Sequence, residues 1–366
     1  MIYKMPVIKR YPKTNNRSLK PFNAADELLL NKARSLRVQQ MKTALLNDRF
    51  GYLTCHLAAE KPLVVIDHKS QEKAIRLNLK NNGIVLNEQY FLSPLDNFPE
   101  SLDLALVQIP KSLNLFKLYL HKIHQASHGN TVVLCGFMTK YFSRQMLKTA
   151  EKFFESVEQS RAQKKARLLI LKGPKQTENI KLLETIRWNG LELQQYLGVF
   201  SSGRIDHATK FLLERFSPRP NEQKILDLAS GNGIIAAHIQ QTFEKNRWPL
   251  PELHLTDDAF LAVESSKLNL PQPHCHHHFS DDLSIFEDGY FDLIITNPPF
   301  HFGHEINTEI SMNLFTQVSQ KLKPGGRFVL VFNRHLVQYR TLLKRLFKET
   351  NLLADSPKFT VWECRK

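Results

Sequence analysis

The sequence predicts an α/β fold in which two Rossmann-like halves follow one another, each with a mostly parallel sheet flanked by helices. Short apolar runs alternate with amphipathic stretches along the whole chain, which is typical of successive βα units. The order of these runs in the first half is repeated in the second. At 366 residues, the chain is long enough for two domains of ordinary size.

The second half shows the alternation most clearly. Apolar runs predict strands at residues 224–230, 253–258, 291–297 and 326–333, and a further strand that ends near Asp282. A helix is predicted over residues 233–243, directly after the first of these strands. Residues 323–326, with the sequence Lys-Pro-Gly-Gly, predict the turn before the last strand.

The first half contains the same segments in the same order. Residues 45–79 correspond in sequence to the first strand, helix and second strand of the second half, and residues 102–111 correspond to 291–300. The offset is 182 between Gly51 and Gly233, 190 between Asp67 and Asp257, and 189 between Gln108 and Asn297. A nearly constant offset indicates a gene duplication, although generic α/β alternation could produce part of the pattern.

We place the domain boundary between residues 183 and 184, giving domains 1–183 and 184–366. Gly173-Pro174 ends the last predicted strand of the first domain. Residues 184–196 predict a β-hairpin that turns at Asn189-Gly190. No low-complexity linker separates the two domains.

Composition excludes several classes of protein. No apolar run approaches the about 18 residues needed to cross a bilayer, and the first ten residues lack the apolar region of a secretion signal. The cysteines are far apart, without a CxxC pair, which fits buried thiols in a reducing cytoplasm. They are Cys55, Cys135, Cys275 and Cys364. We expect a cytoplasmic protein, without association with a membrane, and a monomer.

The positive charge is concentrated in one part of the chain. Residues 1–200 contain 31 Lys and Arg against 16 Asp and Glu, whereas residues 201–366 contain 19 of each sign. A basic field on one domain suits a polyanion such as nucleic acid. A basic arm is expected at the N-terminus, where Tyr3 and Tyr11 lie among six cations. These are Lys4, Lys9, Arg10, Lys13, Arg17 and Lys20.

A glycine-rich loop predicts a cofactor site in the second domain. Asp227-Leu-Ala229-Ser230-Gly231-Asn-Gly233 follows an apolar strand and opens a helix, where glycines allow a ligand to approach the backbone closely. This loop and an acidic residue at the next strand end, Asp257, would also serve NAD. Asp227, four residues before the first glycine, favours a cofactor with an ammonium group over a pyrophosphate.

S-adenosylmethionine carries both an ammonium and a sulfonium group, so carboxylates in the pocket would offset its positive charge. Asp257 is placed to accept hydrogen bonds from ribose hydroxyls. Asp282, nine residues before Phe291, is placed to reach the adenine amino group. Asp257 and Asp282 could instead be solvated residues at strand ends.

The run Asn297-Pro298-Pro299-Phe300 follows the strand at 291–297 and predicts a target site at the carboxyl edge of the sheet. Two prolines hold the backbone, so the Asn297 side-chain oxygen and the Pro298 carbonyl form a rigid pair of acceptors. Such acceptors suit an exocyclic amine whose lone pair must face a methyl donor. Phe300 offers a face on which a base can stack.

Asp227, Asp257 and Asn297 together resemble class I methyltransferases that act on planar amino groups. With residues 297–305, 332–336 and 198–213, and with a degenerate first copy, the chain resembles the bacterial ribosomal RNA guanine-N2 methyltransferases of the RlmG and RsmC type, most of all the large-subunit members. The resemblance implies S-adenosylmethionine-dependent methylation of a guanine N2 in 23S rRNA, with a first domain that lacks activity and binds RNA.

Other functions stay open at this point. They are guanine-N2 methylation of small-subunit 16S rRNA, methylation of a protein glutamine, and a non-catalytic RNA-binding or ribosome-assembly role. In the first copy, the run equivalent to Asn297–Phe300 is Gln-Ile-Pro-Lys and only Gly51 of the loop glycines remains. Residues 274–278, His-Cys-His-His-His, fit no motif, and we expect no metal there because neighbouring strand residues point to opposite faces.

Overall fold

The computed structural model describes residues 5–36, 38–99, 101–176, 179–201, 203–271, 273–298, 301–302, 305–306 and 308–366. The chain divides into two compact units, Met1–Leu182 and Leu183–Lys366, and each is described by itself below. Within these described ranges, no helix is both long enough and apolar enough to span a membrane.

The first unit is a seven-stranded sheet with helices on it. Its strand order is β3-β2-β1-β4-β5-β7-β6, in which β7 is antiparallel to both β5 and β6 and the other neighbouring pairs are parallel. The strands are β1 (Thr43–Leu46), β2 (Leu63–Val65), β3 (Phe91–Leu92), β4 (Leu102–Gln108), β5 (Ser127–Met138), β6 (Phe154–Gln159) and β7 (Ala166–Pro174). The helices are α1 (Ala24–Ser35), α2 (Tyr52–Leu57), α3 (Lys69–Asn81), α4 (Leu113–Gln125) and α5 (Arg144–Ala150).

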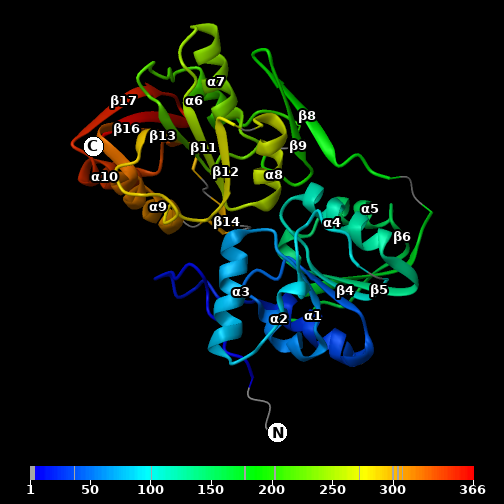
Figure 1. The fold of residues 1–366 in the computed structure, drawn as a ribbon. Helices are drawn as coiled ribbons and strands as arrows, with labels where there is room; N and C mark the ends of the chain where they lie inside the picture. Colours follow the sequence, from blue (N-terminus) through cyan, green and yellow to red (C-terminus); the bar gives the residue numbers. More distant parts are fainter. Residues whose placement is uncertain are drawn as a thin grey trace. The chain divides into compact units, whose positions relative to one another are not determined.

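The second unit begins with a hairpin, β8 (Leu183–Trp188) and β9 (Leu191–Tyr196), and continues into a second seven-stranded sheet of order β12-β11-β10-β13-β16-β18-β17 (Figure 1). The sheet strands are β10 (Lys224–Leu228), β11 (Glu252–Asp257), β12 (Cys275–Phe279), β13 (Phe291–Thr296), β16 (Leu322–Asn333), β17 (Glu349–Asp355) and β18 (Phe359–Arg365). The helices are α6 (His207–Leu213), α7 (Ile234–Lys245), α8 (Phe260–Asn269), α9 (Thr308–Lys321) and α10 (Val337–Leu346), and β14 (His301–Phe302) pairs with β15 (Glu305–Ile306).

The two sheets have the same strand order, which confirms the predicted pair of mostly parallel α/β folds and agrees with a duplication. In each sheet the strand next to one edge is antiparallel to both of its neighbours, as β18 is to β16 and β17. Strands β17 and β18 were not predicted from the sequence. Leu352 and Leu353 on β17 are exposed, so this edge strand lacks the apolar alternation that marks the central strands.

The predicted boundaries hold to within a few residues. β10 ends at Leu228, two residues earlier than predicted, and Asn297 lies just beyond the end of β13. The predicted turn at 323–326 is a bulge inside β16, because Phe291 pairs with Leu322 while Leu293 pairs with Arg327. The hairpin turns at Asn189 and Gly190 as predicted, and both have positive φ, 47° and 79°.

The second sheet separates two apolar cores. Ile225 faces a core shared with α6 and α7, whereas the next residue, Leu226, faces a core shared with α9 and α10. In Figure 1 these two pairs of helices cover opposite faces of the sheet. Both cores bury the middle of β10 and β13, so the carboxyl ends of these two strands leave a rigid support together.

Candidate active site

The glycine-rich loop has a backbone that few sequences can adopt. Ala229, Gly231 and Gly233 all have positive φ, 59°, 56° and 83°. A Cβ on Gly233 would lie 3.1 Å from Leu270 Cδ1 and 3.2 Å from Leu255 Cδ2, so both φ and space require glycine there. Ala229 carries a Cβ in the same left-handed region, at a cost on the order of 1–2 kcal/mol. The surrounding contacts must therefore hold this loop in shape.

Asp227 stands at the base of the loop on β10. Its Oδ2 accepts a hydrogen bond from the N–H of Ala236 in the first turn of α7, at 3.1 Å. Burial raises the pKa of Asp227 to about 7, and the nearby carboxylate of Asp257 adds to the rise. A cation placed beside Asp227 would return its pKa toward the ordinary range. This is the electrostatic setting that the predicted ammonium group of the cofactor requires.

Two polar atoms of the loop are buried and have no partner among the residues that the structure describes. They are Asp227 Oδ1, an acceptor, and Ser230 Oγ, which can donate or accept. Leaving such groups unsatisfied costs on the order of 1–3 kcal/mol each. A polar ligand with an ammonium and a carboxylate, as in the methionine part of S-adenosylmethionine, fits this pair of groups.

Asp257 lies at the end of β11, where the sequence predicted it. Oδ2 accepts the N–H of Gly231 at 2.9 Å and Oδ1 accepts the N–H of Ala259 at 2.8 Å. Burial raises its pKa to about 6, although these backbone hydrogen bonds oppose the rise. Each carboxylate oxygen keeps a second lone pair, so Asp257 can shape the loop and still accept ribose hydroxyls.

Asp282 differs from its predicted place at a strand end. β12 ends at Phe279, and Asp282 lies three residues beyond it in the following turn. Its Oδ1 accepts the backbone N–H of Ser284 at 3.0 Å and the Ser284 hydroxyl at 2.6 Å. The side chain is half-buried, so a role toward the adenine stays a prediction, with one oxygen already engaged in the turn.

The loop after β13 starts beside the glycine-rich loop. Leu228 is opposite Thr296 in the parallel register of β10 and β13, and the Thr296 hydroxyl donates to the Leu228 carbonyl at 2.6 Å. Ala229 and Asn297 therefore leave neighbouring strand ends at the same level. Pro298 is buried, whereas Pro299 and Phe300 lie outside the described residues.

The side-chain amide of Asn297 is held by two residues that the sequence analysis did not identify. Its Nδ2 donates to Asp206 Oδ2 at 3.0 Å and to Thr209 Oγ1 at 2.9 Å. Asp206 is the N-cap of α6, and the same Oδ2 accepts the N–H groups of Ala208 and Thr209. An Asp followed by an apolar-periodic stretch at 206–213 signals a helix start, but not this contact across 91 residues.

The hairpin that precedes the sheet also supports the loop. Gln195 of β9 is fully buried, and its Oε1 accepts a hydrogen bond from Asn232 Nδ2 at 3.0 Å. Asn269 of α8 bridges the two segments, because its Nδ2 donates to the carbonyls of both Gln194 and Asn232 at 2.8 Å. These amide contacts were not predicted, since nothing in the local sequence links residues so far apart.

His276 and His278, from the histidine run at 274–278, belong to a separate cluster on β11 and β12, whereas the His277 ring contacts Ser266 Oγ, with Nδ1 at 2.8 Å. Glu252, His254 and His276 bring metal-ligating atoms within 4.8 Å of one another. The Nε2 atoms of His254 and His276 both lie near Glu252 Oε1, at 2.9 Å and 3.6 Å, and the two rings are stacked, with centroids 4.8 Å apart and an interplanar angle of 29°.

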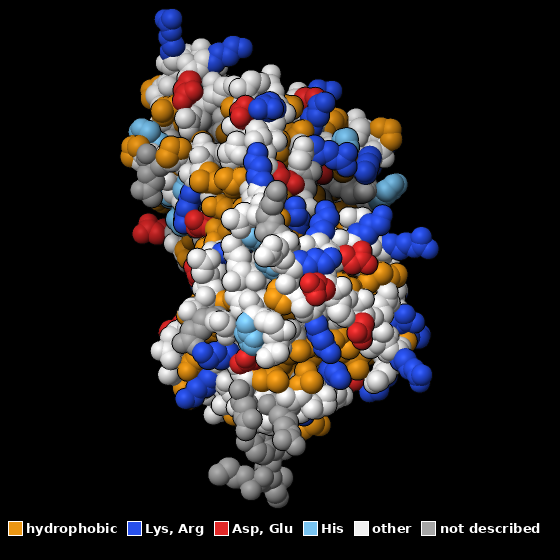
Figure 2. Space-filling view, turned by 90° about the vertical axis from the view of Figure 1, so that its right-hand side faces the viewer, with side chains coloured by type: hydrophobic (Ala, Val, Ile, Leu, Met, Phe, Trp, Pro, Cys, Tyr) orange, Lys and Arg blue, Asp and Glu red, His pale blue; other side chains and the backbone are white. Residues whose placement is uncertain are grey.

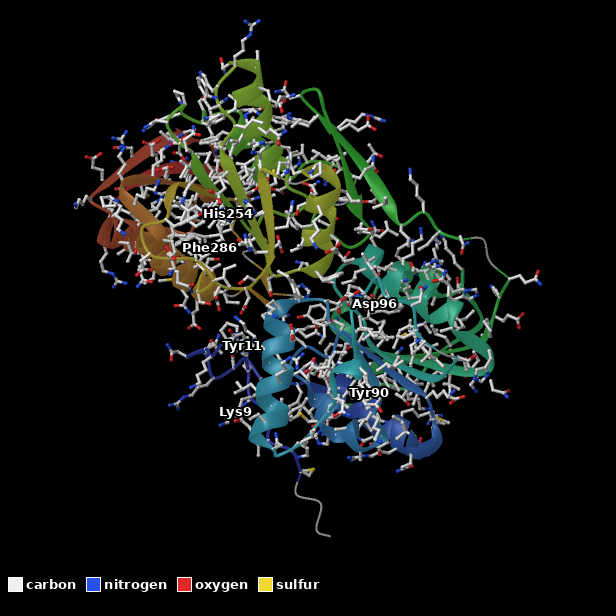
Figure 3. All side chains as sticks on the ribbon, in the orientation of Figure 1. Lys9, Tyr11, Tyr90, Asp96, His254 and Phe286 are labelled. Carbon is white, nitrogen blue, oxygen red and sulfur yellow. The ribbon has the colours of Figure 1, made fainter. Side chains whose placement is uncertain are left out.

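Hydrogen bonds and ring packing account for this cluster. His254 Nε2 lies 2.9 Å from Glu252 Oε1, and its Nδ1 lies 3.1 Å from His278 Nε2. The rings of His254 and Phe286, both labelled in Figure 3, are nearly perpendicular, with centroids 5.4 Å apart. Burial lowers the pKa of His254 and, with its histidine neighbours, lowers that of His278 to about 4. Both rings are therefore neutral at physiological pH and serve as packing groups.

The loop at residues 47–51 of the first unit has a similar backbone to the glycine-rich loop, but it carries a buried carboxylate, Asp48. Asn47 and Gly51 have φ of 61° and 78°, close to those of Ala229 and Gly233. Asp48 is buried, and its Oδ2 accepts the N–H and the hydroxyl of Thr54 in the first turn of α2, both at 2.7 Å. A carboxylate of the chain itself thus occupies the start of α2.

Comparison with known proteins agrees with this architecture. Residues 4–177 match the family described as "RLMG N-terminal domain", and residues 190–363 match the family "Methyltransferase small domain". A T. thermophilus 16S rRNA N2 methyltransferase (RsmC), solved in complex with AdoMet and guanosine, has the same fold. It shares a TM-score of 0.75 and 21% identity, with 99% of this chain and 95% of that chain covered.

Full-length relatives give the family. The ribosomal RNA large subunit methyltransferase G of Shewanella frigidimarina is 30% identical, with 98% of this chain and 96% of the relative covered. The protein of the same name from Streptomyces coelicolor is 31% identical, with 98% of each chain covered. On this likeness over nearly the whole length, the protein belongs to the ribosomal RNA large subunit methyltransferase G family.

Proposed function

We propose that the protein transfers the methyl group of S-adenosylmethionine to the exocyclic N2 amino group of a guanine in 23S rRNA. The observation that carries the proposal is the pair of loops at the ends of β10 and β13. A loop suited to the cofactor and an amide suited to an amino group leave adjacent strands in register. Family membership supports the large-subunit rRNA as the substrate.

In this proposal the residues of β10 and β11 hold the methyl donor. S-adenosylmethionine supplies an electrophilic methyl group on a sulfonium. Asp227 Oδ1 would bind the ammonium group, and the loop from Ala229 to Gly233 would hold the methionine part. Asp257 would accept hydrogen bonds from the ribose, and Asp282 would reach toward the adenine. Because Asp257 also holds the N–H of Gly231, its orientation and the shape of the loop are coupled.

The target amine is oriented by the run that starts at Asn297. Its Oδ1 and the Pro298 carbonyl accept the two amino hydrogens, which turns the nitrogen lone pair toward the methyl group. The guanine nitrogen forms the new N–C bond as the C–S bond breaks, and its surplus proton passes to solvent. Positioning and hydrogen bonding supply the rate, so no strong base is needed. Pro299 and Phe300, the other residues of this run, lie outside the described residues, and stacking of the base on Phe300 stays a prediction from the sequence.

The first unit is proposed to bind RNA without performing chemistry. The excess of positive charge lies in residues 1–200. On the face seen in Figure 2, Lys and Arg side chains are scattered and do not form one patch. The expected N-terminal arm needs one correction. Arg10 is only 9% exposed, lies 4.7 Å over the Phe50 ring and donates to the Lys20 carbonyl, so it packs on the unit instead of reaching for phosphate.

Nucleoside mass spectrometry tests the reaction. Ribosomal RNA from a strain that lacks the protein should lose N2-methylguanosine from one position of 23S rRNA, and the purified protein with S-adenosylmethionine should restore it. The variant Asn297→Ala is the control and should fail to restore it. Methylation of 16S rRNA instead would favour the small-subunit alternative, and an unchanged nucleoside content would overturn the proposal.

A further inference from the structure

The amide of Asn297 is oriented by its hydrogen bonds. A primary amide has two N–H donors, and both have an acceptor: Asp206 Oδ2 at 3.0 Å and Thr209 Oγ1 at 2.9 Å. The group left for a ligand is therefore Oδ1, which can only accept. In the flipped orientation the amide would present donors to an amino group that is itself a donor, and no hydrogen bond could form.

The two acceptors are themselves fixed. Asp206 Oδ2 is held by the N–H groups of Ala208 at 2.9 Å and Thr209 at 3.2 Å, as the N-cap of α6. Thr209 is 7% exposed, and Ala208 and Leu212 of the same helix lie in the core that packs on the second sheet. Neither acceptor can move without disturbing this helix, so the amide has one orientation before any substrate binds.

We propose that Asp206 and Thr209 are positioning residues for methyl transfer, which lock Asn297 with its carbonyl oxygen toward the substrate. This inference rests on the proposed function of Asn297. A hydrogen bond from the amide N–H to a carboxylate also draws electron density toward Oδ1, because linked hydrogen bonds polarise one another. Asp206 therefore makes Asn297 a stronger acceptor for the amino hydrogens.

The first unit contains the same kind of contact and offers a control. Gln108, at the end of β4, donates from Nε2 to Asp26 in the first turn of α1, the helix that precedes β1. This pair joins a helix to a strand end in a unit where Gln-Ile-Pro-Lys replaces the run Asn297–Phe300. A purely structural role for Asp206 would make it behave like Asp26 on substitution.

Four full-length variants separate positioning from structure. Asp206→Ser keeps a favoured N-cap residue but is too short to reach Asn297. Thr209→Val removes the acceptor at nearly constant volume, and Thr209→Ser retains the hydroxyl. Asp26→Asn is the comparison variant in the first unit, where it replaces the carboxylate that accepts from Gln108 by an amide. Each is assayed for kcat and KM with methyl-labelled S-adenosylmethionine and 23S rRNA transcribed in vitro, for S-adenosylmethionine Kd by calorimetry, and for Tm.

The expected pattern is specific to the transfer step. Asp206→Ser and Thr209→Val lower kcat by about 10- to 100-fold, because small displacements of a reacting group are costly, while the Kd for S-adenosylmethionine changes by less than about twofold. Thr209→Ser keeps kcat close to that of the wild type, and Asp26→Asn changes Tm but not kcat.

Other outcomes overturn the inference or the proposed function separately. Wild-type kcat in both Asp206→Ser and Thr209→Val, or losses of kcat that follow Tm equally at Asp26 and Asp206, would overturn the positioning role. If Thr209→Val does not fold, the comparison of Asp206→Ser with Asp26→Asn decides. A wild-type protein that methylates no 23S rRNA would instead overturn the proposed function.

Discussion

Asp227 and Asp48 cap the same helical position in the two units from different places in their loops. Asp227 binds the N–H of Ala236, the third residue of α7, and Asp48 binds the N–H of Thr54, the third residue of α2. Asp227 reaches its partner from the end of β10, whereas Asp48 sits inside the loop at the position equivalent to Ser230. The first unit therefore has a buried carboxylate at the loop position where the second unit has the Ser230 hydroxyl, which is buried and has no partner among the described residues.

We expect one molecule of S-adenosylmethionine to bind per chain, although two similar sheets are present. In the first unit the Asp48 carboxylate already accepts hydrogen bonds from Thr54 at the start of α2. A cofactor could bind there only if this side chain moved away, and its hydrogen bonds would then be lost. Calorimetry on the full chain measures the stoichiometry. A value of two would show that Asp48 yields to the cofactor.

The roles of Asp227 and Asn297 can be separated by substitution. Asp227→Asn keeps an acceptor for Ala236 but removes the charge, and should raise the Kd for S-adenosylmethionine by roughly 10- to 100-fold, as expected for a hydrogen bond to a charged group. Asn297→Ala should leave Kd within about twofold and lower kcat on the order of 100- to 1000-fold. Equal losses of cofactor binding in both variants would contradict this division.

Cofactor affinity should depend on pH through Asp227. Burial raises its pKa to about 7 in the free protein, so a proton competes with the ammonium group below that pH. Affinity should therefore rise by up to about tenfold per pH unit as pH increases toward 7, and fall again above about 8 as the α-amino group loses its proton. Binding measured from pH 5.5 to 9 checks this. Asp227→Asn should lose the acidic limb only, and retention of that limb would exclude Asp227 as its source.

Asp67 should make the first unit less stable at alkaline pH. Burial raises its pKa from 3.8 to about 7, so the folded state holds a proton that the unfolded chain releases. Stability from this group is therefore full below about pH 4 and falls as pH rises toward 7. Asp67→Asn should be more stable than the wild type by on the order of 2–4 kcal/mol at pH 8, with no difference near pH 4.

Denaturant unfolding at several pH values measures this effect. Glu155→Gln, which removes an exposed carboxylate of the same unit, is the control variant. A constant difference between Asp67→Asn and the wild type at all pH values would mean that the substitution acts through packing and not through the proton.

RNA affinity should fall steeply with salt, because neutralised phosphates release counterions. With 6–10 phosphate contacts, the loss is roughly 10³- to 10⁵-fold between about 50 and 200 mM. Replacing four exposed cations of the first unit should flatten the salt slope without changing S-adenosylmethionine affinity, and the matched change in the second unit should not. The two sets are Lys111, Lys152, Arg161 and Lys172, and Lys245, Arg247, Lys344 and Arg345. Equal slopes for both variants would contradict an RNA-binding role of the first unit.

Central strands and the cofactor loop were predictable because their signals are local. The apolar runs of β10 and β11 each lie between helices, that of β13 is a nearly continuous buried run, and the glycine at 233 is required by a left-handed φ that the pattern itself indicates. β17 was missed because it is an edge strand with exposed leucines, and β18 because its pairing on both sides is set by partners far along the chain.

Contacts between segments far apart in the sequence could not be predicted, because no local sequence pattern indicates them. Asp206, Thr209 and Gln195 act on loops that lie 37 to 91 residues away, and only the folded sheet brings them together. The loss of the cofactor site in the first unit was partly predictable, because its loop at residues 47–51 lacks all but one of the glycines. The capping of α2 by Asp48 could not be predicted. Asp48 lies three residues further along its loop than the position equivalent to Asp227, and only the folded loop shows that it reaches the equivalent N–H.

The register between β10 and β13 sets the spacing between the glycine-rich loop and the loop that starts at Asn297. Each residue along a strand spans about 3.3 Å, which is close to the distance between reacting atoms in a productive complex. A slip of one residue at the pair Leu228 and Thr296 would separate donor and acceptor by a whole bond-forming distance, even with every side chain intact. Single-residue insertions or deletions inside β13 should therefore abolish methyl transfer more completely than the loss of any one side chain.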